Sequence, residues 1–224
     1  MKLTKRQKTW ANLDTEKVYS LSDAIETLRG YASKKFDESL EIAIKLGIDI
    51  TKADQNIRGM LSLPNGTGKT VRVAVFTVNS ADEAIKAGAD IVGGEDLIEK
   101  VAGGEINFDR VIATPDMMPK MSKIARILGP KGLMPNPKLG TVTNNVAEAV
   151  KTAKAGQIEY RAEKKGIIHA GIGKMSFTTD QLVENANALI DQLKKVKPSS
   201  TKGQYILGAS VATTQGPGLK VDVK

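Results

Sequence analysis

The middle of the chain alternates strand-like and helix-like segments, and this alternation constrains the fold more than any other feature. After Gly68, the β-branched run TVRVAVFTV is followed by a short helical pattern, a brief strand, a second helical pattern and the strand FDRVIAT. Strands that alternate with helices form a parallel sheet flanked by helices. We therefore expect residues 66–157 to form a small domain of this kind, with a last helix over about 145–154.

The segment before this block has a different periodicity. SLEIAIKLGIDI places an apolar residue at every second position from Leu40 to Ile50, which is the period of a half-buried strand. The preceding SDAIETL predicts a helix with Ser22 as its N-cap. IRGMLSLP predicts a second strand, which we expect to pair with the first.

The segment after the block returns to the first pattern. KGIIHAGIGK predicts a strand, SFTTDQLVENANALIDQLKKV a capped amphipathic helix, and GQYILGASVA and GLKVDV two further strands. The simplest interpretation is one discontinuous domain, 1–65 plus 158–224, into which the continuous domain 66–157 is inserted.

Composition argues against several classes of protein. The chain has no cysteine and a single histidine, His169, which disfavours disulfides, thiolate metal sites, cysteine nucleophiles and a histidine-based triad. No apolar run approaches the roughly 20 residues that span a bilayer. The N-terminal MKLTKRQKTW lacks the apolar core of a secretory signal. We expect a cytoplasmic protein with no membrane contact, no metal and no cofactor.

The charge of the chain indicates a polyanionic partner. The formal net charge is +8 and the isoelectric point is near 9.5. Residues 1–64 and 158–224 together hold 21 basic and 15 acidic residues, whereas 65–157 hold 12 and 10. Most of the positive excess therefore lies outside the inserted block, which favours the discontinuous domain as the binder.

The stretch NGTGKT, residues 65–70, ends with the Gly-Lys-Thr of a phosphate-binding loop, but the residues around it do not fit such a loop. Leu63 occupies the position of the first glycine, Pro64 follows it, and a strand rather than a helix comes after Thr70. A flexible glycine hinge between domains is the better interpretation. Five acidic residues of the inserted block lie at predicted helix starts or on helical faces, where solvated positions are the favoured interpretation, so no catalytic pair is visible. They are Asp82, Glu83, Glu95, Asp96 and Glu99.

The segment MMPKMSKIARILGPKGLMPNPKLGTVT, residues 117–143, is basic and contains no acid. Its four prolines and three glycines predict a single short helix at about 122–128 and a chain that buries little. Such a loop, with uncompensated cations, is either a phosphate-contacting surface or a solvated loop packed by its methionines. The cations are Lys120, Lys123, Arg126, Lys131 and Lys138.

Two clusters of residues in the discontinuous domain have side chains suited to RNA contacts. Lys34 and Lys35 stand beside Phe36 at the entrance to a strand, where cations can bind phosphates and a ring can stack on a base. For Phe36 alone, packing in the core is the favoured interpretation. Near the C-terminus, SVATTQGPGLK predicts a turn whose hydroxyls and bare backbone can approach a ribose.

Four stretches give the chain a resemblance to the ribosomal protein L1 family, bacterial type, over essentially its whole length. They are FDESLEIAIKLGID, ARILGPKGLMPNPKLGTV, GIIHAGIGKMSF and TTQGPG. The resemblance implies a discontinuous α+β domain of the split, ferredoxin-like type that binds large-subunit rRNA. It also implies an inserted three-layer α/β domain, Rossmann-like, that either faces tRNA or modulates the reach of the protein.

The resemblance further implies a ribosome-associated structural protein that is not an enzyme and is monomeric when free. Its expected partners are the rRNA of the mobile stalk near the tRNA exit site, the exit-site tRNA that it helps to release, and its own operon mRNA, which it represses. Carried over by motif, the RNA-binding residues are Lys34, Lys35, Phe36, Glu38, Ser39, Thr213, Thr214, Gly216 and Pro217, with Lys164, Lys165, His169 and Lys174 as weaker candidates.

One position departs from the family pattern. Gln215 stands where the family usually has methionine, which argues against the need for an apolar contact there. Two other functions remain open from the sequence alone: a general RNA-binding chaperone and a nucleotide-binding α/β enzyme.

Overall fold

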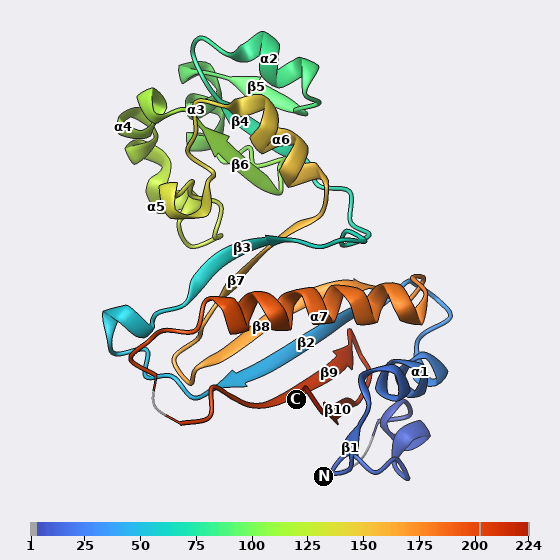
Figure 1. The fold of residues 1–224 in the computed structure, drawn as a ribbon. Helices are drawn as coiled ribbons and strands as arrows, with labels where there is room; N and C mark the ends of the chain where they lie inside the picture. The colour runs from blue at the N-terminus through green and yellow to red at the C-terminus, as the bar shows by residue number, and fades with distance from the viewer. Residues whose placement is uncertain (1–3, 202, 224) are drawn as a thin grey trace. The chain divides into compact units, whose positions relative to one another are not determined.

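The computed structural model describes residues 4–201 and 203–223 (Figure 1). Contacts between Cα atoms divide the chain into two compact units. The terminal unit consists of Met1–Gly68 and Ile158–Lys224, and the inserted unit of Lys69–Gln157. The protein is a mixed α/β protein with several sheets.

The terminal unit is built on a five-stranded sheet of order β1-β10-β9-β2-β8. Its edge strand β1 pairs with β10 in parallel, and the other pairs are antiparallel. The strands are β1 (Val18–Tyr19), β2 (Ser39–Leu46), β8 (Ile167–Lys174), β9 (Ile206–Thr213) and β10 (Gly218–Val221).

Two helices, α1 (Leu21–Tyr31) and α7 (Thr179–Lys195), share one apolar core with this sheet. The even-numbered residues of β2 are buried from Leu40 to Leu46, as the period of two predicts, and the strand ends there. Thr178 and Gln181 form a capping box at the start of α7. The predicted N-cap of α1 is wrong: Ser20 has the extended backbone and its hydroxyl accepts from the Asp23 N–H at 3.1 Å.

The strand β3 (Arg58–Ser62) does not pair with β2, so this prediction is also wrong. β2 already has β8 on one side and β9 on the other, and both of its edges are therefore occupied. β3 instead forms a separate two-stranded sheet with β7 (Gln157–Arg161), a strand that the sequence patterns did not indicate.

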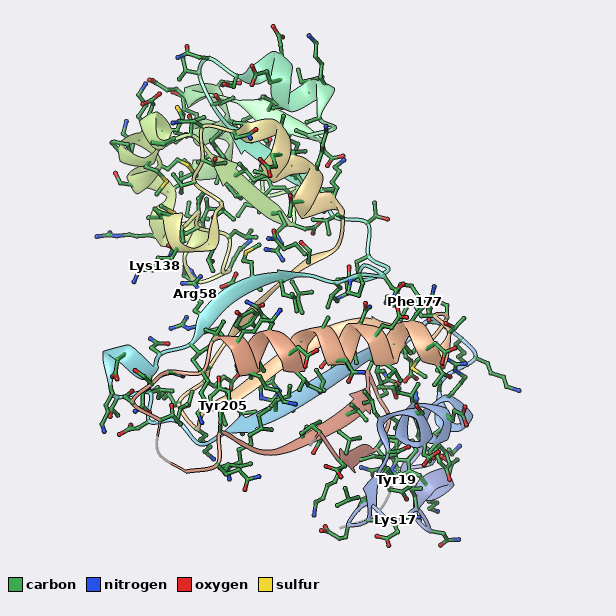
Figure 2. All side chains as sticks on the ribbon, viewed as in Figure 1. Lys17, Tyr19, Arg58, Lys138, Phe177 and Tyr205 are labelled. Atoms are coloured by element: carbon green, nitrogen blue, oxygen red, sulfur yellow. The ribbon has the colours of Figure 1, made fainter. Side chains whose placement is uncertain are left out.

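The glycine-rich stretch after β3 is fixed to the terminal unit. The buried side chain of Asn185 accepts from the Asn65 N–H at 3.0 Å and donates to the carbonyls of Gly66 at 2.9 Å and Ile172 at 2.7 Å. Gly68 lies against Phe177, which stands beside the start of α7 (Figure 2). Any hinge must therefore begin after Gly68 rather than at Asn65.

The inserted unit contains a three-stranded parallel sheet of order β5-β4-β6. The strands are β4 (Val73–Phe76), β5 (Ile91–Gly93) and β6 (Arg110–Ala113), and the main helices are α2 (Ala81–Lys86), α3 (Glu95–Ala102) and α6 (Val146–Lys154). Two separate apolar clusters use alternate residues of β4. One contains α3, the other contains α2 and α6, so helices lie on both faces of the sheet.

The basic segment after β6 is more regular than the sequence predicts. Helical turns run from Pro115 to Leu128, as η3 (Pro115–Met117), α4 (Met118–Met121), η4 (Ser122–Ile124) and α5 (Ala125–Leu128), and a further turn, η5, covers Pro137–Leu139. The expectation of one short helix is wrong because Pro119 lies in the first turn of α4, where no N–H is needed.

The expectation that this segment buries little is wrong as well. Met117, Met121, Ile124 and Leu128 are fully buried, and their spacing of three and four residues is that of one helix face. The methionines thus belong to the core of the inserted unit. In the described residues, none of the helices has the length and apolar character needed to cross a membrane.

Candidate nucleic-acid interface

The segment 33–39 runs into the start of β2. Three consecutive residues, Asp37, Glu38 and Ser39, attach it to three different parts of the terminal unit. The first is Asp37. Its carboxylate accepts from the Ser176 N–H at 3.1 Å and from the Ser176 hydroxyl at 2.8 Å. The segment is thereby fixed to the loop between β8 and α7.

Glu38 makes the second attachment from a buried position. Its carboxylate accepts from the Arg6 guanidinium and from the Ser33 N–H at 2.8 Å. Burial acts to raise the pKa of Glu38, but the neighbouring Thr213 hydroxyl, the two donors and the charge of Arg6 outweigh it and hold the pKa below its ordinary value. Glu38 therefore stays ionised and holds the segment to the N-terminal residues.

Ser39 makes the third attachment, to the turn between β9 and β10. Its N–H donates to Thr214 Oγ1 at 2.9 Å, and its carbonyl accepts from the Thr214 N–H at 3.1 Å. The next pair along the strands, Leu40 and Thr213, is in register in the sheet. The two segments that sequence analysis singled out are therefore neighbours at one end of the five-stranded sheet.

The three residues before these attachments are exposed to solvent, whereas the segment that carries them is held in place. Lys34, Lys35 and Phe36 are exposed, and the Phe36 residue is 44% exposed. The core interpretation of Phe36 is therefore wrong. Lys174 joins the same end of the sheet, since it pairs with Ser39 across β2 and β8 and its Nζ donates to the Asp37 carbonyl at 3.1 Å.

The turn after β9 combines buried and exposed residues. Thr213 and Pro217 are buried, whereas Thr214 and Gln215 are exposed. The Gly216 N–H donates to the Thr213 carbonyl at 3.1 Å, which closes the turn, and a Cβ on Gly216 would collide with Thr213 Oγ1. In the described structure, Thr213 Oγ1 and Glu38 Oε2 are buried without a hydrogen bond of normal geometry.

Comparison with known protein families identifies the family of this chain. A family model described as the ribosomal protein L1p/L10e family matches residues 28–217, a range that contains both segments of the interface and the whole inserted unit. The chain belongs to this family. As a member of the L1p/L10e family it is a ribosomal protein of the large subunit that binds RNA, and it is not an enzyme.

Three of the weaker candidates lie away from this interface in the L1p/L10e fold. Lys164 and Lys165 are in the turn before β8, and the next residue of this turn, Gly166, is hydrogen-bonded to Leu46 at the far end of β2. The length of β8, about 24 Å, separates this turn from Lys174. Tyr205 marks that end in Figure 2. His169 lies in the middle of β8 opposite Ala43, with an exposed imidazole 3.8 Å from Glu163.

Exposed cations of the basic segment 117–143 make up a second basic group, on the inserted unit. Lys123, Arg126, Lys131 and Lys138 are exposed on the segment whose apolar residues face the core. Lys120 is also exposed, but its Nζ lies 2.5 Å from Glu95, so the expectation that all five cations are uncompensated is wrong for Lys120.

Two residues that hold the candidate interface together, Arg6 and Asp37, carry no signal in the sequence patterns. Arg6 contacts both Glu38 and Gln215, yet nothing in the basic N-terminal run marks it as part of this site. Its partner Gln215 lies 209 residues away, and no local pattern encodes such a pairing. Among the described residues, no group of histidine and acidic side chains is arranged to hold a metal ion.

Proposed function

We propose that the terminal unit binds a structured segment of large-subunit rRNA at the end of the sheet where Ser39 meets Thr214. The observation that carries this proposal is the pair of hydrogen bonds between these residues, which brings the lysine-bearing and the threonine-bearing segments together. We further propose that this rRNA is the mobile stalk near the tRNA exit site, as for a bacterial L1 protein.

The chemistry of the exposed groups suits RNA. Lys34 and Lys35 can neutralise phosphates, and Phe36 can stack on an unpaired base. Thr214 and the backbone at Gly216 can approach 2′-hydroxyl groups, which distinguish RNA from DNA. Glu38, Thr213 and Pro217 are buried and act by fixing the geometry of these contacts.

The two units have separate roles in this proposal. A discontinuous domain, 1–65 plus 158–224 and of the split, ferredoxin-like type, holds the rRNA. The inserted domain, 66–157 and Rossmann-like, turns its exposed basic group toward exit-site tRNA and assists the release of deacylated tRNA. The free protein is a cytoplasmic monomer, and the rRNA surface also binds a similar structure in its own operon mRNA, which represses translation.

Filter binding tests this function directly. A fragment of the rRNA stalk and an unrelated RNA of equal length are compared at two salt concentrations. We expect the stalk fragment to bind with at least about a 1,000-fold preference that persists at the higher salt concentration. Equal binding of both RNAs, with a steep loss in salt, would instead indicate a general RNA chaperone.

A further inference from the structure

Arg6 connects the two segments of the RNA interface through separate nitrogen atoms. Its NH1 donates to Gln215 Oε1 at 2.7 Å, and its NH2 donates to the buried carboxylate of Glu38. The same NH2 lies 3.5 Å from the Tyr31 carbonyl at the end of α1. The planar fork of a guanidinium can serve two acceptors at once, which a single ammonium nitrogen on a flexible stem does less well.

The aromatic residues of the N-terminal segment support this position of Arg6. The guanidinium carbon lies 5.8 Å from the centre of the Trp10 ring, within the range of a cation–π contact. Trp10 in turn packs edge-on against Tyr31, with ring centres 6.4 Å apart and an interplanar angle of 78°. The guanidinium is thus held between an aromatic ring and a carboxylate.

This contact fixes which way the Gln215 amide points. A guanidinium has only donors, so the amide must present its oxygen to Arg6. The Nε2 group, with its two N–H donors, is then directed away from Arg6. Gln215 is exposed, and none of the hydrogen bonds in the described residues uses its Nε2.

We propose that Gln215 Nε2 donates a hydrogen bond to an acceptor oxygen of bound RNA, and that Arg6 is the positioning residue that orients it. The inference rests on the proposed function, because Gln215 adjoins Thr214 and Gly216 at the RNA surface. An amide donor is neutral, so it adds affinity for a correctly placed acceptor without increasing the salt dependence of RNA binding.

Three variants separate this role from a purely structural one. Gln215→Glu keeps an acceptor for Arg6 but removes both donors, and Gln215→Met removes acceptor and donors while keeping the length of the side chain. Arg6→Lys keeps the charge beside Glu38 but offers one nitrogen to two acceptors. Gln204→Met, at an exposed position before β9, is the matched control.

The affinity of each variant for the rRNA stalk fragment is measured at two salt concentrations, together with its thermal unfolding. We expect Gln215→Met to bind about 5- to 10-fold more weakly with an unchanged salt slope, Gln215→Glu to bind more weakly still, and Arg6→Lys to follow Gln215→Met. Gln204→Met should match the wild type. Binding of Gln215→Met within twofold of the wild type would overturn the inference.

A spectroscopic measurement gives a second readout that a structural role would not change. In ¹⁵N spectra, the side-chain NH₂ signal of Gln215 should shift and exchange more slowly with solvent when the rRNA fragment is added. An unchanged signal on saturation would overturn the inference while leaving the proposed function intact. A wild-type protein with no preference for the stalk fragment would overturn both.

Discussion

The Ser39 N–H donates to Thr214 Oγ1, and the Thr214 N–H donates back to the Ser39 carbonyl, although the two residues are 175 positions apart. This reciprocal contact continues the register of β2 and β9 by one residue past the end of β9. It gives the lysines before β2 and the turn after β9 a fixed relative position, which a recognition surface for folded RNA requires.

The hydroxyl of Thr214 should matter for both stability and affinity. Thr214→Val keeps the shape of the side chain but leaves the Ser39 N–H without its acceptor, so we expect a loss of about 1–3 kcal/mol in rRNA binding. Thr214→Ser retains the hydroxyl and serves as control. Filter binding of both variants checks the prediction, and unaltered affinity of the valine variant would remove Thr214 from the site.

Gly216 should be sensitive to the smallest substitution. A methyl group there would collide with the buried Thr213 hydroxyl, and we expect Gly216→Ala to displace the turn and weaken rRNA binding about 10-fold. Gly218→Ala is the matched control, because nothing lies within 4 Å of the added methyl group. Equal affinities of the two alanine variants would show that the turn tolerates the change.

Glu38 should contribute stability that depends on pH. Because its pKa is lower in the folded protein than the ordinary 4.5, its contribution is complete above about pH 4.5 and is lost as pH falls through the folded pKa. Glu38→Gln should therefore be less stable than the wild type at pH 7, by about 1–3 kcal/mol. Urea unfolding should show this difference shrinking as the pH falls below 4.5; a constant difference would contradict the linkage.

Asn185 should be the most sensitive polar residue of α7. Asn185→Ala leaves the Asn65 N–H and the carbonyls of Gly66 and Ile172 without their partner, and we expect a loss on the order of 3 kcal/mol in the free energy of unfolding. Asn187→Ala, on the exposed side of the same helix, is the control. Urea denaturation of the two variants should separate them clearly, and equal stabilities would contradict the assignment.

The exposed cations of the inserted unit should act on tRNA rather than on rRNA. The double variant Lys123→Ala with Arg126→Ala should weaken binding of deacylated tRNA to ribosomes and reduce its salt slope by about one for each lost phosphate contact. Lys86→Ala with Lys151→Ala, also exposed in this unit, is the control. Identical tRNA binding by both double variants would argue against the assignment.

Sequence periodicity was sufficient to predict those strands and helices that are encoded by a local pattern of residues. The alternation from Leu40 to Ile50 predicted β2, although the strand ends at Leu46, and the strand–helix alternation after Gly68 predicted the parallel sheet. The pairing partners of the strands could not be predicted from local patterns, because both edges of β2 pair with strands from the far end of the chain. β3 therefore had to pair elsewhere.

The same distinction applies to the interface. The lysines and threonines carry recognisable RNA chemistry, but the residues that hold them do not. Arg6 became visible only through its contacts with Glu38 and Gln215, and Asp37 only through Ser176. Phe36 was misassigned because hydrophobic residues are usually buried, whereas its segment is held by the polar residues that follow it.

Mapping the bound RNA on the terminal unit is the most direct test. Backbone amide signals of the ¹⁵N-labelled protein are followed as the rRNA stalk fragment is added. We predict that the largest changes occur at Lys34–Ser39 and Thr213–Gly216, and that Lys164 and Lys165 at the far end of the sheet change little. Changes confined to Lys164 and Lys165, with none at Ser39 or Thr214, would contradict the proposed interface.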